Sequence, residues 1–280
     1  MAADAGELAD WLALAEQVAR SGGDVLLEAQ RRITRDSAEF KGRRTELVTE
    51  ADRAAEHAVV EPLLAACPEH GVLAEEGVLT PKGLAHQDAR LLWLVDPLDG
   101  TTNFVHHLPF YAVSVCLVEA GNAGEPGDPL VGVVHAPALD WTFSATRGDV
   151  AQCNGEPIGV STTTAIADAL LATGFSYNRS EAGVDDNVGR LRRALHGCRD
   201  LRRYGSAALD LCMTAIGRLD GFWELYLQPY DVAAGALIVM AAGGRVTDLG
   251  GGNNWLRGGE IGASNGKLLD QLLELVGSPG

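Results

Sequence analysis

Residues 93–104 read WLVDPLDGTTNF, and this stretch of the chain is the most informative about its fold and chemistry. The apolar start predicts a buried strand, and Pro97 is expected to hold Asp96 extended and to end the strand there. Asp96 and Asp99 would then emerge at the carboxyl end of the strand, where open α/β sheets place their ligand sites. Gly100 permits a sharp turn, after which backbone N–H groups can face an anion.

This combination of residue types suits a divalent metal and a phosphate together. Carboxylate oxygens are hard ligands that such cations prefer, and a turn lined by amides can hold an anion. An isolated D-x-x-D-G would be explained well enough by an ordinary turn between two elements. The full twelve-residue string argues against that simpler explanation.

The bulk composition sets limits on the classes of function. A length of 280 residues allows one large layered domain or two intimate subdomains. The formal net charge of −16 argues against nucleic-acid binding, which needs basic surface, although bound cations let an acidic chain act on phosphates. No apolar stretch approaches the ~18 residues of a membrane span, and the acidic N-terminus does not resemble a targeting signal. We therefore expect no membrane association.

The cysteines indicate the compartment. Five are scattered along the chain with no C-x-x-C pair, which is typical of free thiols in a reducing environment and not of disulfides or zinc sites. We therefore expect a cytoplasmic protein. The five are Cys67, Cys116, Cys153, Cys198 and Cys212.

Hydrophobic periodicity divides the chain near residue 155. Helical spacing predicts a helix over residues 7–35, which the glycines at 22–23 could break, and a second over residues 50–66. Residues 109–148 alternate and contain turns, which indicates an antiparallel meander. After residue 155, strands and helices alternate. We predict an α+β subdomain over residues 1–155 and an α/β subdomain over residues 156–280.

Four further acids stand out, although each has a bland explanation. Glu75 follows a short strand, and Asp52 also fits a helix capping box. Asp231 precedes an apolar helix and could simply be its N-cap, while Glu224 lies between apolar neighbours, where an unpaired carboxylate would be costly. These acids gain force only when they are considered together.

Together, four stretches resemble the ordered motifs of the inositol monophosphatase family of Mg²⁺-dependent phosphatases. They are WLVDPLDGTTNF, GVLAEEG, LVTEAD and WELYLQPYDVAAG, which occur in the family's order and at its approximate spacing. The resemblance runs from Lys41 through the helix after Asp231. The first and last strings are highly specific, whereas the other two would not identify the family unaided.

The resemblance implies a metal site with two or three Mg²⁺ ions. Glu75, Asp96 and the backbone carbonyl of Leu98 would bind one ion. Asp96, Asp99 and Asp231 would hold another. Four carboxylates around one cleft would repel one another, and divalent cations would hold them together. Two metals about 4 Å apart can clamp the attacking and leaving oxygens of an in-line displacement, so no cysteine, serine or histidine nucleophile is implied.

The resemblance also implies catalytic and substrate-binding roles. Thr101, helped by Asp52 and beside Glu75, would activate the attacking water. Lys41 would lie on a loop near the site and help to set metal affinity. The substrate contacts would come from Asp99, Gly100, Thr101, Thr102, Gly205, Ser206, Ala207 and Glu224.

Departures from the family pattern and competing functions remain open. Tyr230 stands where the family usually has Trp, and Glu46 where it usually has Asp. Thr102, Asn103 and Phe104 match inositol phosphatases and not the branch that acts on 3′-phosphoadenosine 5′-phosphate. Histidinol-phosphate phosphatase and fructose-1,6-bisphosphatase use the same metal site and stay as alternatives, as does a non-catalytic regulatory binding protein. A haloacid dehalogenase would need D-x-D near the first strand of the chain. Here the spacing is D-x-x-D and it comes at residue 96, so that assignment fails.

The resulting expectation is a layered αβαβα sugar-phosphatase fold of the α/β class with its site in the cleft between the two subdomains. The expected activity is Mg²⁺-dependent hydrolysis of myo-inositol 1-phosphate or a close polyol phosphate. By resemblance, Li⁺ should inhibit the enzyme, and the protein should form a homodimer.

Overall fold

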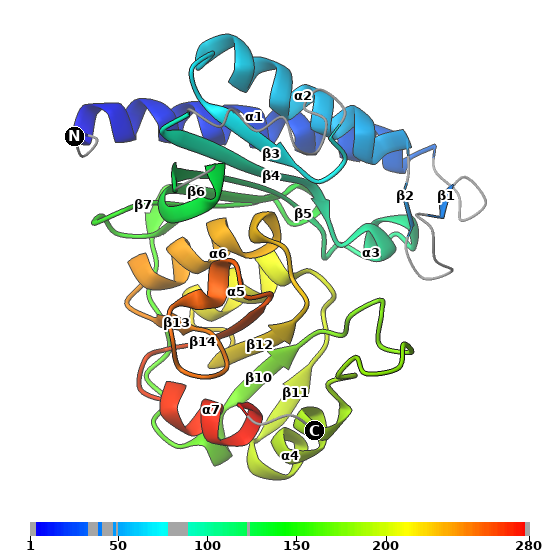
Figure 1. Ribbon diagram of the computed structural model, residues 1–280, viewed down its shortest axis with the longest axis vertical. Helices are drawn as coiled ribbons and strands as arrows, with labels where there is room; N and C mark the ends of the chain where they lie inside the picture. Colours follow the sequence, from blue (N-terminus) through cyan, green and yellow to red (C-terminus); the bar gives the residue numbers. More distant parts are fainter. Residues whose placement is uncertain are drawn as a thin grey trace.

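A computed structural model describes residues 4–32, 39–40, 47–48, 50–77, 89–121 and 124–277. Its elements form five layers, with two sheets separated and covered by helices (Figure 1). Helices α1 (Ala5–Gln30) and α2 (Glu50–Ala66) lie together on the outer face of the larger sheet. The predicted αβαβα architecture is confirmed, and so is the helix predicted over residues 50–66.

The larger sheet has seven strands, in the same order in space as in the sequence. Only its first two strands pair in parallel, and all other pairs are antiparallel. Strands β5 to β7 form the antiparallel meander that the alternation predicted over residues 109–148. The strands are β3 (Gly71–Ala74), β4 (Leu91–Asp99), β5 (Ala112–Ala120), β6 (Pro126–Ala136), β7 (Trp141–Thr146), β8 (Gln152–Cys153) and β9 (Glu156–Pro157).

The smaller sheet is mixed, in the order β11-β10-β12-β14-β13. Strand β10 pairs in parallel with β11 and β12, whereas β14 runs antiparallel to both of its neighbours. The sequence patterns did not predict β14. The strands are β10 (Leu170–Thr173), β11 (Asp200–Arg202), β12 (Gly221–Leu225), β13 (Arg245–Thr247) and β14 (Glu260–Ser264). The division of the chain near residue 155 stays a prediction.

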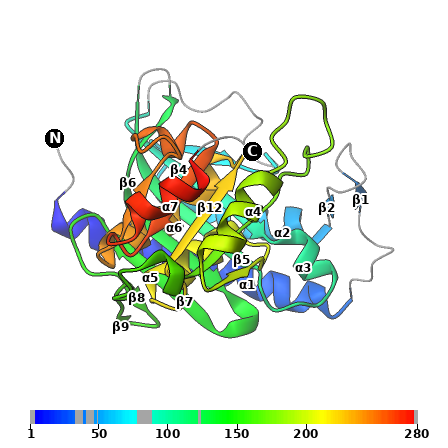
Figure 2. The same cartoon turned by 90° about the horizontal axis from the view of Figure 1, so that it is seen from below.

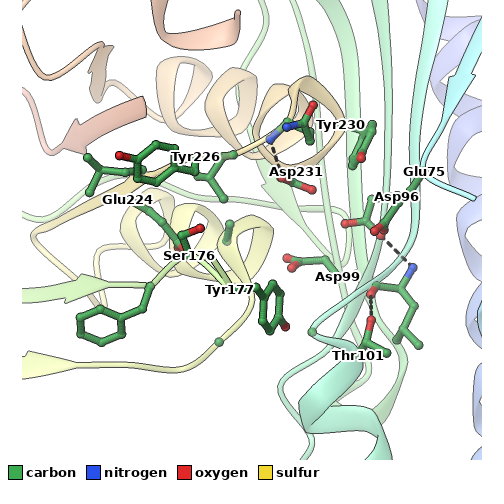
Figure 3. Close-up of a pocket in the computed structure, with 18 of the residues that line it drawn as sticks. Glu75, Asp96, Asp99, Thr101, Ser176, Tyr177, Glu224, Tyr226, Tyr230 and Asp231 are labelled. Carbon is green, nitrogen blue, oxygen red and sulfur yellow. Dashed lines mark hydrogen bonds between the residues drawn. The ribbon is translucent and has the colours of Figure 1, made fainter. Parts of the chain in front are cut away.

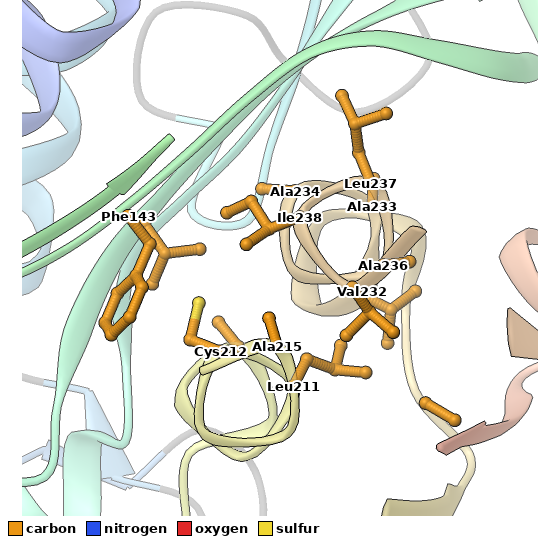
Figure 4. Packing of buried hydrophobic residues seen from close by; sticks show 14 of the residues in the cluster. Phe143, Leu211, Cys212, Ala215, Val232, Ala233, Ala234, Ala236, Leu237 and Ile238 are labelled. Carbon is orange, nitrogen blue, oxygen red and sulfur yellow. The ribbon is translucent and has the colours of Figure 1, made fainter. Parts of the chain in front are cut away.

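The middle layer consists of α5 (Ala207–Ala215) and α6 (Pro229–Ala241), which lie between the sheets. All residues of α5 and the central residues of α6, Val232–Val239, are buried, because the two helices contact a sheet on either side (Figure 4). Figure 2 shows the molecule from below, where the layers lie one behind another. The remaining helices and short strands are α3 (Thr101–Val105), α4 (Val188–Gly197), α7 (Leu269–Val276), β1 (Glu39–Phe40) and β2 (Leu47–Val48). None of the described helices is long and apolar enough to cross a membrane.

The apolar run before Asp96 is explained by burial on both faces of β4. Leu92 and Leu94 belong to the core shared with α5 and α6, whereas Trp93 and Val95 belong to the core beneath α1 and α2. Alternate side chains of a strand point to opposite faces, so a strand covered on both sides is apolar throughout. This burial fixes the strand that carries the two aspartates.

Two local predictions were wrong. Helix α1 continues through Gly22 and Gly23, because side chains of α2 and β6 pack directly against these glycines. Added methyl groups there would come within 2.8 Å of Val59 and 2.5 Å of His135. Strand β4 does not end at Asp96 but continues to Asp99, with a shift in register between the two aspartates. Such an irregularity around a proline is how a strand accommodates the missing N–H group.

Candidate active site

A cavity of about 530 Å³ brings together most of the residues that the sequence singled out (Figure 3). They come from the end of β4, the turn after β3, the first turn of α6, strand β12 and the start of α5. The predicted residues that line it are Glu75, Asp96, Leu98, Asp99, Gly100, Thr101, Gly205, Ala207, Glu224 and Asp231.

The end of β4 is held by short local hydrogen bonds. The Leu98 N–H donates to Asp96 Oδ1 at 2.9 Å, and the Thr101 hydroxyl donates to the Leu98 carbonyl at 3.2 Å. Gly100 has φ 96°, and an added Cβ would lie 2.9 Å from the Phe110 carbonyl oxygen. Both its conformation and the close approach of this carbonyl therefore require glycine.

Asp99 is held at the N-terminus of α5. Its Oδ2 accepts hydrogen bonds from the Ser206 hydroxyl at 2.6 Å and from the Ala208 N–H at 2.7 Å. Ser206 is also the N-cap of α5. The partial positive charge of a helix N-terminus favours the ionised carboxylate. Ser206 therefore binds Asp99, whereas its neighbours Gly205 and Ala207 line the cavity.

Asp231 lies inside the first turn of α6 and is not its N-cap. The helix begins at Pro229, three residues before the start that we predicted, and Gln228 is the N-cap. Asp231 Oδ2 accepts a hydrogen bond from the Gln228 N–H at 2.6 Å. In Figure 3 its carboxylate faces the side of the cavity that carries Glu75 and Asp96.

Glu56 supports the turn that carries Glu75, and sequence reasoning missed it. Its carboxylate is fully buried and accepts hydrogen bonds from the N–H groups of Glu76 at 2.7 Å and Gly77 at 3.2 Å. Asp52 lies one helical turn before Glu56 on α2 and is also buried, and its charge raises the pKa of Asp96. The spacing of four residues places both acids on one helix face, but it does not reveal that Glu56 binds the turn after β3.

The carboxylates of the cavity are electrostatically unfavourable neighbours. Burial raises the pKa of Asp96 and Asp231 well above the usual range, and repulsion from Glu75 and the other acids raises both further. Burial raises the pKa of Asp99 to about 6 despite its hydrogen bonds, and the pKa of Glu224 to about 8.

A hard divalent cation fits this set of donors. Buried, mutually repelling carboxylate oxygens are stabilised by positive charge, and such cations take oxygen ligands. In the described part of the chain, no three acidic, histidine or cysteine side chains form a ready-made metal cluster. The fit is therefore one of donor chemistry and charge, and coordination distances do not contribute to it.

The opposite wall of the cavity was not predicted. Phe175, Ser176 and Tyr177 follow β10, at the carboxyl end of a parallel strand, and Arg203 and Tyr226 also line the cavity. The strand-end position was the signal for the first three. Thr102 lies beside this wall, with its hydroxyl 3.5 Å from the Tyr177 hydroxyl.

Two positions discussed from the sequence lie outside the described residues. These are Lys41, predicted to lie on a loop near the site, and Glu46, one of the departures from the family pattern. The predicted role of Lys41 therefore stays a prediction.

Comparison with known proteins assigns the family. The model of the inositol monophosphatase family matches residues 7–278. The chain belongs to the inositol monophosphatase family. The resemblance predicted from the motifs is therefore confirmed, and the protein is a phosphatase of this family.

Individual members of the family agree in length and fold. The chain is 38% identical to an inositol-1-monophosphatase of Synechocystis over 96% of this chain and 90% of that protein. It is also 38% identical to the Nus factor SuhB of Pseudomonas aeruginosa over 95% of both chains. The solved inositol monophosphatase of Anabaena (Nostoc) superposes with a TM-score of 0.84 at 36% identity, over 98% of this chain and 97% of that one.

Proposed function

We propose that this phosphatase hydrolyses myo-inositol 1-phosphate, or a close polyol phosphate, with Mg²⁺ as its cofactor. The observation that carries the proposal is the gathering of Glu75, Asp96, Asp99 and Asp231 around one cavity. Acids that repel one another at this density need a cationic partner, and an acidic pocket alone would exclude a phosphate ester. Bound Mg²⁺ would supply the missing positive charge and acidify the attacking water.

In this proposal the acids divide the metal-binding work. Glu75 and Asp96, with the Leu98 carbonyl, hold one ion, and Asp96, Asp99 and Asp231 hold another. The Leu98 carbonyl oxygen already accepts a hydrogen bond from the Thr101 hydroxyl but keeps a second lone pair for a metal. Glu56 contributes indirectly, because it fixes the turn from which the Glu75 side chain projects.

The remaining residues bind the phosphate, the water and the polyol. The Gly100 and Thr101 amides hold the phosphate at the sharp turn, and Thr101 with Asp52 orients the attacking water. Glu224 and the segment Gly205–Ala207 meet the hydroxyl groups of the polyol. Within this segment the Ser206 hydroxyl is committed to Asp99, so its neighbours supply the substrate contacts.

A panel of phosphate esters tests the proposal. Phosphate release would be measured with and without Mg²⁺ from inositol 1-phosphate, histidinol phosphate, fructose 1,6-bisphosphate and 3′-phosphoadenosine 5′-phosphate. We expect Mg²⁺-dependent preference for inositol 1-phosphate. Preference for histidinol phosphate would keep the metal chemistry and overturn the substrate, and no Mg²⁺-dependent release from any ester would overturn the proposed enzyme.

The proposal extends to the location and assembly of the protein. We infer a cytoplasmic homodimer, which is supported by the scattered free cysteines and by the family. Light scattering of the purified protein at several concentrations tests the dimer, for which a mass near twice 29.5 kDa is expected.

A second candidate role comes from the names of the relatives. The P. aeruginosa relative is named a Nus factor, and we propose the same role for this chain as a second candidate. The test is replacement of the relative in P. aeruginosa by this chain and by its Asp96→Asn variant. Replacement by both would assign a role independent of the cavity acids, and failure of both would remove this candidate.

A further inference from the structure

Gly174 lies directly beneath the carboxyl group of Glu224. Strands β10 and β12 run in parallel with Thr173 opposite Trp223, so the residues that follow these two are neighbours at the carboxyl end of the sheet. A methyl group added to Gly174 would lie well within 3.0 Å of the carboxyl carbon and both oxygens of Glu224. The Glu224 carboxyl group therefore occupies the space that any side chain at position 174 would need.

The backbone does not explain this glycine. Gly174 does not have a left-handed backbone conformation, so any L-residue could adopt its φ angle. The obstacle to a side chain is the end of the Glu224 side chain and not a backbone atom. A substitution at Gly174 is therefore expected to move the carboxyl group more than to unfold the strand.

Asn187 locks the two strand ends together. Its Nδ2 donates hydrogen bonds to the Thr173 hydroxyl and to the Gly174 carbonyl, both at 2.8 Å. Its Oδ1 accepts a hydrogen bond from Trp223 Nε1 at 2.9 Å. Thr173, Trp223 and Asn187 are all buried, and the Thr173 hydroxyl donates to the Trp223 carbonyl at 2.8 Å. One buried amide thus holds both Gly174 and the residue before Glu224.

We propose that Gly174 is a positioning residue for substrate specificity, which sets the place of the Glu224 carboxyl group through a strand end that Asn187 locks. The proposal rests on the proposed function, because Glu224 is there the group that meets a polyol hydroxyl. Gly174 itself touches no substrate. Its contribution is the absence of a side chain, which lets the carboxyl group lie against the backbone and face the cavity.

The test compares Gly174→Ala with the matched control Gly159→Ala. Gly159 is exposed, also lacks a left-handed φ, and has its nearest atom 3.9 Å from an added Cβ. Both variants would be assayed with Mg²⁺ on inositol 1-phosphate and on phenyl phosphate, which offers no ring hydroxyl. For Gly174→Ala we expect kcat/KM on inositol 1-phosphate to fall roughly tenfold more than on phenyl phosphate, mainly through KM, as for one displaced hydrogen bond.

A double variant separates positioning from general damage. Once Glu224→Ala has removed the carboxyl group, adding Gly174→Ala should cause no further loss on inositol 1-phosphate. Equal losses on the two esters, no loss beyond the Gly159→Ala control, or a further loss in the Glu224→Ala background would overturn the positioning role while leaving the proposed function intact. No release of phosphate from inositol 1-phosphate by the wild type would overturn both.

Discussion

Replacing Glu224 by glutamine should stabilise the metal-free protein, increasingly so as the pH rises. In the unfolded chain this carboxyl group ionises near its ordinary pKa of 4.5, whereas burial raises its pKa in the folded protein to about 8. Folding therefore carries a penalty that is absent below pH 4.5, grows between pH 4.5 and about 8, and is constant above. Glutamine has the same shape and cannot ionise, so it removes the penalty.

The size of the effect follows from the pKa shift. A rise of this extent corresponds to a ceiling of roughly 5 kcal/mol. The side chain lies in a cavity open to water, which screens its charge, so we expect about 2 kcal/mol at pH 9.

Urea unfolding in EDTA between pH 4.5 and pH 9 measures this difference. Glu156→Gln, on the exposed strand β9, is the matched control for the exchange of a glutamate for glutamine. The free energy of unfolding of Glu224→Gln minus that of the wild type should be near zero at pH 4.5 and rise with pH. A difference that is independent of pH would refute the argument.

Three other substitutions test the supports of the cavity. Ser206→Ala removes a helix cap and a hydrogen bond that lowers the pKa of Asp99. The free energy of unfolding, measured in urea, should fall by about 1–2 kcal/mol. The acid limb of the pH profile of kcat/KM should move to higher pH. An unmoved acid limb would argue against this role. Glu56→Gln weakens the acceptor of two turn N–H groups, so the Mg²⁺ concentration for half-maximal activity should rise several-fold; an unchanged value would remove Glu56 from the site. Asn187→Gly keeps the left-handed backbone but leaves the Trp223 indole N–H without its acceptor. The free energy of unfolding, measured by calorimetry or in urea, should fall by about 1–3 kcal/mol. An unchanged free energy of unfolding would contradict the locking role of Asn187.

Much of the fold could be predicted because local pattern and tertiary packing agree. Strand β4 is apolar throughout since both its faces are buried, and the sequence displays this directly. The glycines of α1 misled the prediction, because they serve close packing against Val59 and His135 and not a break. Strand β14 was missed because it forms by pairing with β12 and β13, and local sequence does not show these partners.

The site divides in the same way. Asp96, Asp99 and Asp231 stand in specific strings, so their presence in one cavity could be anticipated. Glu56 and Asn187 could not be predicted as supports, because their partners lie 20 or more residues away in one case and 13 or more in the other. Supporting residues act through long-range contacts that leave no periodic trace in the sequence.

The central claim is that the acids of the cavity bind Mg²⁺ for hydrolysis of a polyol phosphate. Its most direct test is phosphate release from inositol 1-phosphate by the wild type and Asp96→Asn across a range of Mg²⁺ concentrations. The wild-type rate should rise from near zero with Mg²⁺, and the variant should lose about a hundredfold or more at every concentration. A wild-type rate that is independent of Mg²⁺, or a variant as active as the wild type, would contradict the claim.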